Sequence, residues 1–199
     1  MVVLRYFLIA GRAGLLLNLL GSPLAVSRIV FDPSEGNVPE LATSEITRSI
    51  LVQRRWAEDS DRTPAERTGA KRNAARLASA HELHGKGAIE VLDLTVTERT
   101  LFARLTSSGR LKELGLRFPL DPGEAASLVL AIERGLVLAT DDTDALKALE
   151  AVQPDHPYER IRRLLRRAGE QRLVSRTEAN AIHAEMRRLG FWDTGRVFP

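Results

Sequence analysis

The sequence predicts an α/β protein in which helices cover both faces of a parallel sheet, with extra helices at the C-terminal end. Short apolar segments alternate along the chain with longer segments whose apolar residues recur at helical spacing. This alternation is typical of parallel sheets, because each crossover between parallel strands needs a long connecting element. The chain has 199 residues, 44% of them hydrophobic, which is enough for one domain with a buried core.

The clearest pattern lies in residues 119–149. Asp121 is expected to cap a helix and Pro122 suits its first position, while Gly135 is expected to end it. The apolar run at 136–140 is expected to form a buried parallel strand, followed by a second helix. This part of the chain therefore predicts a helix–strand–helix unit.

The other elements follow from the same periodicity and from the turn residues between them. The predicted helices are two short ones within 5–20 and longer ones at 40–56, 70–83, 158–168 and 176–189. Thr95 or Thr97 is expected to cap one more helix, which ends at residue 105. The predicted strands are 24–26 and 89–94, and the charged segment 59–68 is expected to be a loop.

Charge is divided unevenly along the chain, whose formal net charge is +3. Residues 158–199 hold ten Arg and five acidic residues, a net of +5, so the remainder carries about −2. We predict one main α/β domain at 1–150. Residues 151–199 are predicted to be a basic helical extension packed on the same domain. Contacts with a polyanion are expected at this basic end.

The composition also limits the cellular setting and the chemistry. The absence of Cys excludes disulfides and thiolate metal sites, and it fits a cytoplasmic protein. The apolar residues 1–27 are interrupted by Arg5 and Arg12, and the uncharged run 13–27 is too short to span a bilayer. This region also fits a signal peptide poorly, so a folded start and no membrane contact are expected.

Carboxylates gather where predicted strands end and predicted helices begin. The set is Asp32, Glu124, Asp141, Asp142 and Asp144. Open α/β sheets bind their ligands at the C-terminal ends of the strands, and carboxylate oxygens are ligands that Mg²⁺ and Mn²⁺ prefer. The alternative is that Asp121 and Asp142 only cap helices, with the other carboxylates in solvent.

Two segments of this region resemble the second half of a PIN domain. They are residues 120–131 and 135–142. In that family an acid opens a helix and an apolar strand then ends in Thr-x-Asp, so Glu124 matches the first acid and Asp142 the second. Residues 3–8, 11–12, 24–26 and 29–32 are similar more loosely, and the resemblance covers roughly residues 1–150.

The resemblance implies a PIN-like α/β sandwich and a metal-dependent ribonuclease. Many members of the family are toxins of toxin–antitoxin pairs, so it also implies an RNA substrate, an antitoxin partner and a homodimer. The expected cofactor is Mg²⁺ or Mn²⁺, held by Glu124 and Asp142. Asp32 is expected to complete the site, and Asp141 or Asp144 to support it.

The sequence departs from the family in its N-terminal half. The family opens with a strand that ends in Asp, which would fall at or just before Met1. Three explanations fit: the family's first strand is absent, the open reading frame begins late so that the chain is truncated at its N-terminus, or the protein is a degenerate member. Asp32 is the closest match to the family's second acid, with Glu35 and Glu45 as alternatives. A site without its first Asp is expected to bind metal weakly. The alternative function is therefore a catalytically degenerate PIN-like module that binds RNA or a protein.

A second group of candidate residues lies in the Arg-rich segment 158–167. Arg160, Arg163 and Arg167 fall near one helical face, with Arg162 and Arg166 on an adjoining face. Guanidinium groups suit bidentate contacts with phosphate, so this face is expected to bind the RNA backbone or an acidic partner. The alternative is an ordinary solvated helix.

Overall fold

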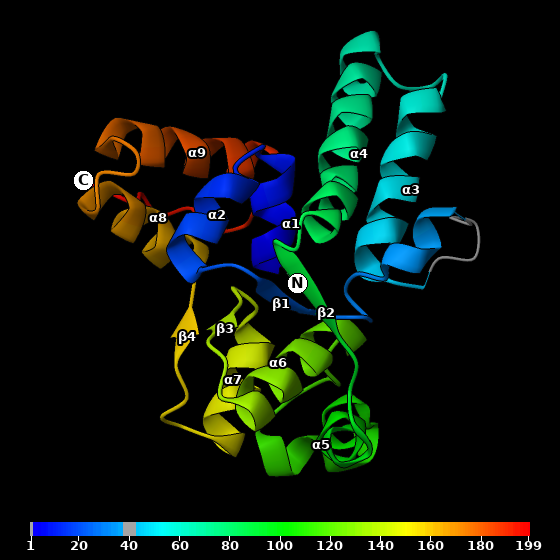
Figure 1. Cartoon of the computed structure of the whole chain (residues 1–199), viewed down its shortest axis with the longest axis vertical. Coiled ribbons are helices and arrows are strands. Elements are labelled where there is room, and N and C mark those ends of the chain that lie inside the picture. The colour runs from blue at the N-terminus through cyan, green and yellow to red at the C-terminus, as the bar shows by residue number, and fades with distance from the viewer. Residues whose placement is uncertain (1, 38–42) are drawn as a thin grey trace.

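The computed structural model describes residues 2–37 and 43–199, which form a mostly helical α/β protein (Figure 1). In these residues the nine α-helices are α1 Val2–Ile9, α2 Ala13–Leu20, α3 Glu45–Glu58, α4 Pro64–Gly85, α5 Val96–Thr106, α6 Pro122–Arg134, α7 Thr143–Val152, α8 Ile161–Glu170 and α9 Arg176–Arg188. The strands are β1 Leu24–Ser27, β2 Ile89–Leu92, β3 Leu138–Ala139 and β4 Tyr158–Glu159, and the short helices are η1 Pro33–Asn37 and η3 Ser108–Leu114.

The strands form two small parallel sheets in the described residues, where the sequence predicted one larger sheet. β1 pairs with β2 so that Leu24 lies opposite Ile89, and β3 pairs with β4 so that Leu138 lies opposite Tyr158. A cavity of about 510 Å³, lined mostly by apolar side chains, lies between β1 and β3. The α/β class and the parallel pairing are therefore confirmed, but a continuous PIN-like sandwich is not.

Buried hydrophobic residues form two groups within the described part of the chain. One is built by α1, α2, β1, α3, α4, β2, α8 and α9, with Phe7, Phe31 and Leu164 fully buried in it. The other is built by α5, η3, α6, β3 and α7 around Leu105 and Leu128. Figure 1 shows α8 and α9 beside α1 and α2. The C-terminal helices thus share a core with the start of the chain.

The prediction of a loop at 59–68 is wrong from residue 64 onward. Thr63 caps α4 by accepting a hydrogen bond from the Glu66 amide, and the Glu66 side chain accepts one from the Thr63 amide in return. Pro64 occupies the first helical turn, where its missing N–H costs nothing. α3 and α4 therefore form a helical hairpin that projects from the body (Figure 1).

The predicted helix–strand–helix unit at 119–149 is present. Asp121 Oδ1 accepts a hydrogen bond from the Gly123 amide at 3.0 Å, and Gly135 ends α6 in the left-handed region with φ 63°. The helix predicted at 158–168 begins later, at Ile161. Residues 158–159 instead pair with β3, where the Thr140 amide donates to the Glu159 carbonyl at 3.0 Å.

None of the helices in residues 2–37 and 43–199 combines the length and the apolar character needed to cross a bilayer.

Candidate functional site

Asp142 is the last residue between strand β3 and helix α7, and it caps the N-terminus of α7. Its Oδ1 accepts a hydrogen bond from the Ala145 amide at 2.7 Å, and its own amide donates to Thr140 Oγ1 at 3.1 Å. These two bonds hold the Asp142 carboxylate at the N-terminal end of α7. The end of a helix that carries free N–H groups favours negative charge, so the local sequence places an acidic side chain where a helix N-terminus can stabilise it.

Glu124, in the first turn of α6, lies within the electrostatic reach of that acid. Burial and, after it, the negative charges of Asp142, Asp121 and Asp144 raise the pKa of Glu124 to about 7. Like charges have this effect only when they lie close together. The structure thus brings together three of the carboxylates selected from the sequence, Glu124, Asp142 and Asp144.

Glu45, the first residue of α3, joins the same group. A Cβ placed on Gly123 would lie only 1.6 Å from Glu45 Oε1, so the Glu45 carboxyl lies directly against the first turn of α6. Burial raises the pKa of Glu45 to about 8, assisted by a hydrogen bond with Asp121 and by the charges of Asp121 and Glu124. The same hydrogen bond lowers the pKa of Asp121.

We call this group of carboxyls the acidic site. Its members are Glu45, Asp121, Glu124, Asp142 and Asp144. Three elements that are distant in sequence, α3, α6 and α7, each contribute their N-terminal ends to it. Of the three acids considered for the second position of the PIN pattern, Glu45 is the one that lies at this site.

Asp32 has a different set of partners. Its Oδ1 accepts hydrogen bonds from the Ser34 amide at 2.9 Å and from Ser34 Oγ at 2.7 Å, and it forms an ion pair with Arg28 at 3.2 Å. Asp32 is absent from the charges that raise the pKa values of Glu45 and Glu124. The structure therefore does not bring Asp32 into the acidic site.

Glu35 has a structural role between η1 and α3. Its Oε1 accepts hydrogen bonds from the Thr43 amide at 2.6 Å and the Ser44 amide at 3.0 Å. Burial opposes the ionisation of Glu35, but hydrogen bonds from Ser44 and Thr43 outweigh it and lower its pKa to about 2. Glu35 thus fixes the residues immediately before α3, and with them the position of Glu45.

Asp141 also has its hydrogen-bonding partners outside the acidic site. Its carboxylate is fully buried, accepts a hydrogen bond from the Ile161 amide at 2.8 Å, and pairs with Arg160 Nε at 3.2 Å. Burial raises the pKa of Asp141, while these two contacts lower it. The residue therefore anchors the start of α8, and the structure does not place it among the carboxyls of the acidic site.

The donors of the acidic site suit a hard divalent cation in their chemistry. Burial and repulsion from neighbouring carboxylates disfavour the ionised forms of Glu45 and Glu124, and Glu45 Oε1 is buried without a hydrogen-bond donor in the described part of the chain. A cation would relieve both penalties. Among the described residues no three acid or His side chains are already arranged as metal ligands.

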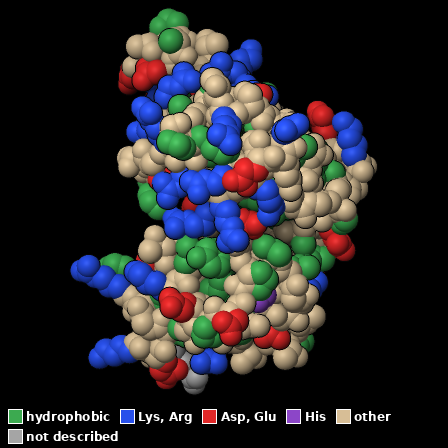
Figure 2. All heavy atoms as spheres, turned by 90° about the vertical axis from the view of Figure 1, so that its left-hand side faces the viewer, with side chains coloured by type: hydrophobic (Ala, Val, Ile, Leu, Met, Phe, Trp, Pro, Cys, Tyr) green, Lys and Arg blue, Asp and Glu red, His purple; other side chains and the backbone are tan. Residues whose placement is uncertain are grey.

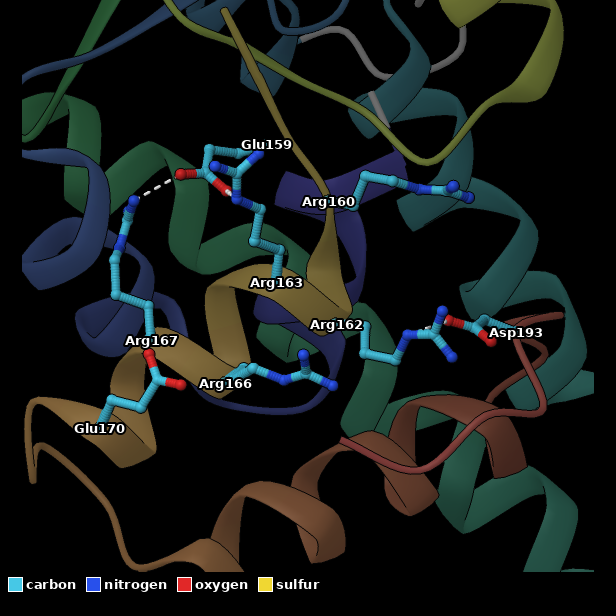
Figure 3. Close-up of a pocket in the computed structure, with 8 residues that line it drawn as sticks. All are labelled: Glu159, Arg160, Arg162, Arg163, Arg166, Arg167, Glu170 and Asp193. Carbon is cyan, nitrogen blue, oxygen red and sulfur yellow. Dashed lines mark hydrogen bonds and ion pairs between the residues drawn. The ribbon is translucent and has the colours of Figure 1, made fainter. Parts of the chain in front are cut away.

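A second candidate site lies on α8, where arginines gather across the middle of the face drawn in Figure 2. Their side chains line a cavity of about 560 Å³, which we call the arginine cavity (Figure 3). It is lined by Glu159, Arg160, Arg162, Arg163, Arg166, Arg167, Glu170 and Asp193. The three arginines selected from the sequence all line this cavity, together with Arg162 and Arg166.

Most of these arginines are held by neighbouring groups. Arg162 pairs with Asp193 at 3.5 Å, and Arg163 pairs with Glu159 at 3.6 Å. Arg166 donates to the Val197 carbonyl at 3.2 and 3.3 Å, and Arg167 pairs with Glu159 and donates to the Leu19 carbonyl at 2.7 Å. Helical spacing could not reveal the partners at residues 19, 193 and 197, because these come from distant segments. Glu159, by contrast, lies only four residues before Arg163.

Comparison of the chain with protein family models found no match. Comparison with curated proteins and with solved structures also found none. No relative therefore assigns a role to the acidic site or to the arginine cavity.

Proposed function

We propose that this chain is a PIN-like, metal-dependent ribonuclease that hydrolyses RNA phosphodiester bonds at the acidic site. The observation that carries the proposal is the crowding of Glu45, Glu124 and Asp142 at the ends of three helices, where burial and repulsion raise two of their pKa values. Groups with strongly raised pKa values in one cluster are common at catalytic and metal-binding sites.

In this proposal Glu124 and Asp142 hold Mg²⁺ or Mn²⁺, and Asp144 adds negative charge nearby. When bound, such an ion supplies Lewis-acid stabilisation of the phosphodiester. Glu45 has a pKa of about 8 and therefore carries a proton at neutral pH, hydrogen-bonded with Asp121. A carboxyl that titrates near neutral pH can move a proton during hydrolysis.

The PIN-like arrangement is supported by the order of these acids along the chain. Glu45 begins a helix after the first parallel strand, Glu124 lies in the first turn of α6, and Asp142 follows β3. The toxin role, an antitoxin partner and a homodimer stay predictions from the resemblance.

The second candidate function is a catalytically degenerate module that binds RNA or a protein. It is favoured by the absence, in residues 2–37 and 43–199, of a ready-made group of three metal ligands. The two candidates differ in whether RNA is cleaved or only bound.

Cleavage of a labelled single-stranded RNA with Mn²⁺ separates them. The proposal predicts Mn²⁺-dependent cleavage that falls at least about a hundredfold in Glu124→Gln, because the loss of a metal ligand removes a large part of the transition-state stabilisation. Asp155→Asn, which removes an exposed acid after α7, is the matched control and should cleave like the parent. Binding without cleavage would support the second candidate. Equal cleavage by Glu124→Gln would contradict the placement of the reaction at the acidic site.

A further inference from the structure

We propose that the arginine cavity and Trp192 form a binding subsite for single-stranded RNA, in which the arginines hold phosphates and a base stacks on the indole. This inference rests on the proposed RNA substrate and names a site outside the acidic one. Its elements are α8 and the segment after α9, which come together at one face of the molecule (Figure 3).

The cavity carries an excess of positive charge. Five arginines and three acids line it, a net of +2, and none of the three acids lies in the acidic site. The acids hold some of the guanidinium groups in place, as Asp193 does for Arg162 and Glu159 for Arg163 (Figure 3). Pre-positioned guanidinium groups suit phosphate oxygens, which they can bind in a bidentate manner.

Two of the guanidinium groups are open to a ligand. The Arg163 side chain is 70% exposed and that of Arg162 is 45% exposed. Their ion pairs, at 3.5 and 3.6 Å, are long and partly in solvent, so they cost little to replace with phosphate contacts. Arg166 and Arg167, by contrast, are fixed to backbone carbonyls and shape the cavity.

The exposed side chain of Trp192 favours a nucleic acid, rather than a simple anion, as the ligand of this cavity. It is 54% exposed beside Asp193, and the Arg160 guanidinium carbon lies 5.7 Å from its ring centroid. Phe191, which is buried, contacts Trp192 with ring centroids 5.8 Å apart and so anchors the segment. An exposed indole next to clustered arginines is the combination that binds single strands, since phosphates meet the cations and a base stacks on the ring.

The cavity is connected to the acidic site through two consecutive acids. Asp141 pairs with Arg160 of the cavity, and the next residue, Asp142, belongs to the acidic site. Consecutive Cα atoms are about 3.8 Å apart, so the two sites are neighbours on one scaffold.

The test is the binding of fluorescein-labelled oligouridylate to the full chain in EDTA, measured by fluorescence anisotropy. In EDTA no divalent ion is available, so binding is measured without cleavage. Arg162→Gln/Arg163→Gln should weaken binding at least about tenfold and lower the slope of log K against log salt by about 1.4, since each phosphate contact on a single strand contributes about 0.7. Trp192→Ala should weaken binding by about tenfold or more.

Matched variants remove the same groups elsewhere. Lys71→Gln/Arg72→Gln removes two exposed cations from α4, and Trp56→Ala removes another exposed indole, from α3. Both should bind oligouridylate like the parent. An equal loss in these controls would mean diffuse electrostatic attraction and would overturn the inference. Equally tight binding of poly-glutamate that is lost in the same variants would also overturn it, in favour of an acidic protein partner.

Cleavage and oligouridylate binding, measured on the same variants, distinguish a failure of the RNA subsite from a failure of the proposed function. Glu124→Gln should abolish cleavage but keep full oligouridylate binding in EDTA, because its carboxyl is not among the residues that line the cavity. If the parent binds through the cavity but never cleaves RNA, the proposed function fails and the subsite stands. If the parent cleaves RNA but the arginine and Trp192 variants bind like it, the subsite alone fails.

Discussion

The carboxylate of Asp141 is fully buried against α8, and Arg160 Nε lies 3.2 Å from it. The neighbouring acid, Asp142, instead caps α7 and contributes negative charge beside Glu124. Two adjacent acids thus have different roles: Asp141 stabilises the fold, and Asp142 belongs to the acidic site. Substitution of Asp141 should therefore lower the free energy of unfolding more than substitution of Asp142.

Asp141→Ala should destabilise the protein by about 3 kcal/mol, because it removes the acceptor for the buried Ile161 amide and leaves Arg160 without its partner. Asp142→Asn should change the free energy of unfolding by less than about 1 kcal/mol, since Asn is an equally good helix cap. Urea unfolding at neutral pH measures both. Similar losses in the two variants would contradict this division of tasks.

Gly123→Ala should leave the fold intact but disturb the acidic site. The new Cβ would occupy the space of Glu45 Oε1, which is the end of a side chain that can move away. Ala is favourable in a helix, so the free energy of unfolding should change by less than about 1 kcal/mol. Mn²⁺-dependent cleavage should nevertheless fall at least about tenfold, since the Glu45 carboxyl is displaced.

Gly169→Ala is not a suitable control, because Phe198 ring atoms lie 2.7 Å from the position of its Cβ. Gly14→Ala is suitable, since a Cβ at Gly14 in α2 meets nothing within 4 Å. It should retain cleavage. Unchanged cleavage in Gly123→Ala as well would mean that the position of Glu45 does not matter.

The acidic site should make the folded protein less stable as pH rises. The pKa of Glu45 is raised from 4.5 to about 8 and that of Glu124 to about 7, first by burial. Between pH 4.5 and these values the folded chain holds more protons on Glu45 and Glu124 than the unfolded chain does. The contribution of these two residues to the free energy of unfolding is therefore highest below pH 4.5 and falls as pH rises to about 8. Both side chains are partly exposed, so a fall on the order of 2 kcal/mol is expected from this site.

Glu45→Gln should remove most of that decline between pH 5 and 8, measured as the difference in urea unfolding between parent and variant. Millimolar Mn²⁺ should also reduce the decline in the parent, because a cation that binds the ionised carboxyls stabilises the folded state. A parent whose stability rises over this pH range, with no effect of the variant, would rule out the crowding of these acids.

The second acid of the site can be tested by comparing Glu45→Gln with Asp32→Asn. The structure places Glu45 against α6, whereas Asp32 contacts Arg28 and Ser34. Mn²⁺-dependent cleavage should fall at least about tenfold in Glu45→Gln and change less than about threefold in Asp32→Asn. The reverse order would restore Asp32 to the site.

Two acids of the acidic site, Glu124 and Asp142, could be predicted from local sequence signals. Glu124 follows a helix cap and a Pro, and Asp142 follows an apolar strand, so their positions depend on residues within a few places of each. The charge effect of Asp142 on the pKa of Glu124 fits that prediction of proximity. The helix cap at Thr63 is equally local, but it lies in a charged segment, where no apolar periodicity indicates a helix.

Other features depend on contacts between distant segments, which spacing along the chain does not encode. Glu45 reaches Gly123 across 78 residues, and Glu35 fixes the approach to α3 through Thr43 and Ser44. The apolar run before Asp32 predicts that its carboxylate lies at the end of a strand. Its Oδ1 instead pairs with Arg28 and accepts hydrogen bonds from Ser34. The late start of α8 results from the pairing of residues 158–159 with β3, which overrides helical propensity there.

The central claim, that the acidic site binds a divalent cation, is tested most directly by titrating the protein with Mn²⁺ and measuring free Mn²⁺ by electron paramagnetic resonance. We predict one site in the parent, with the same affinity in Asp155→Asn, at least about tenfold weaker binding in Glu124→Gln and in Asp142→Asn, and weaker binding as pH falls below about 7, where Glu124 takes up a proton. No binding by the parent, or equal binding by all four proteins, would contradict the claim.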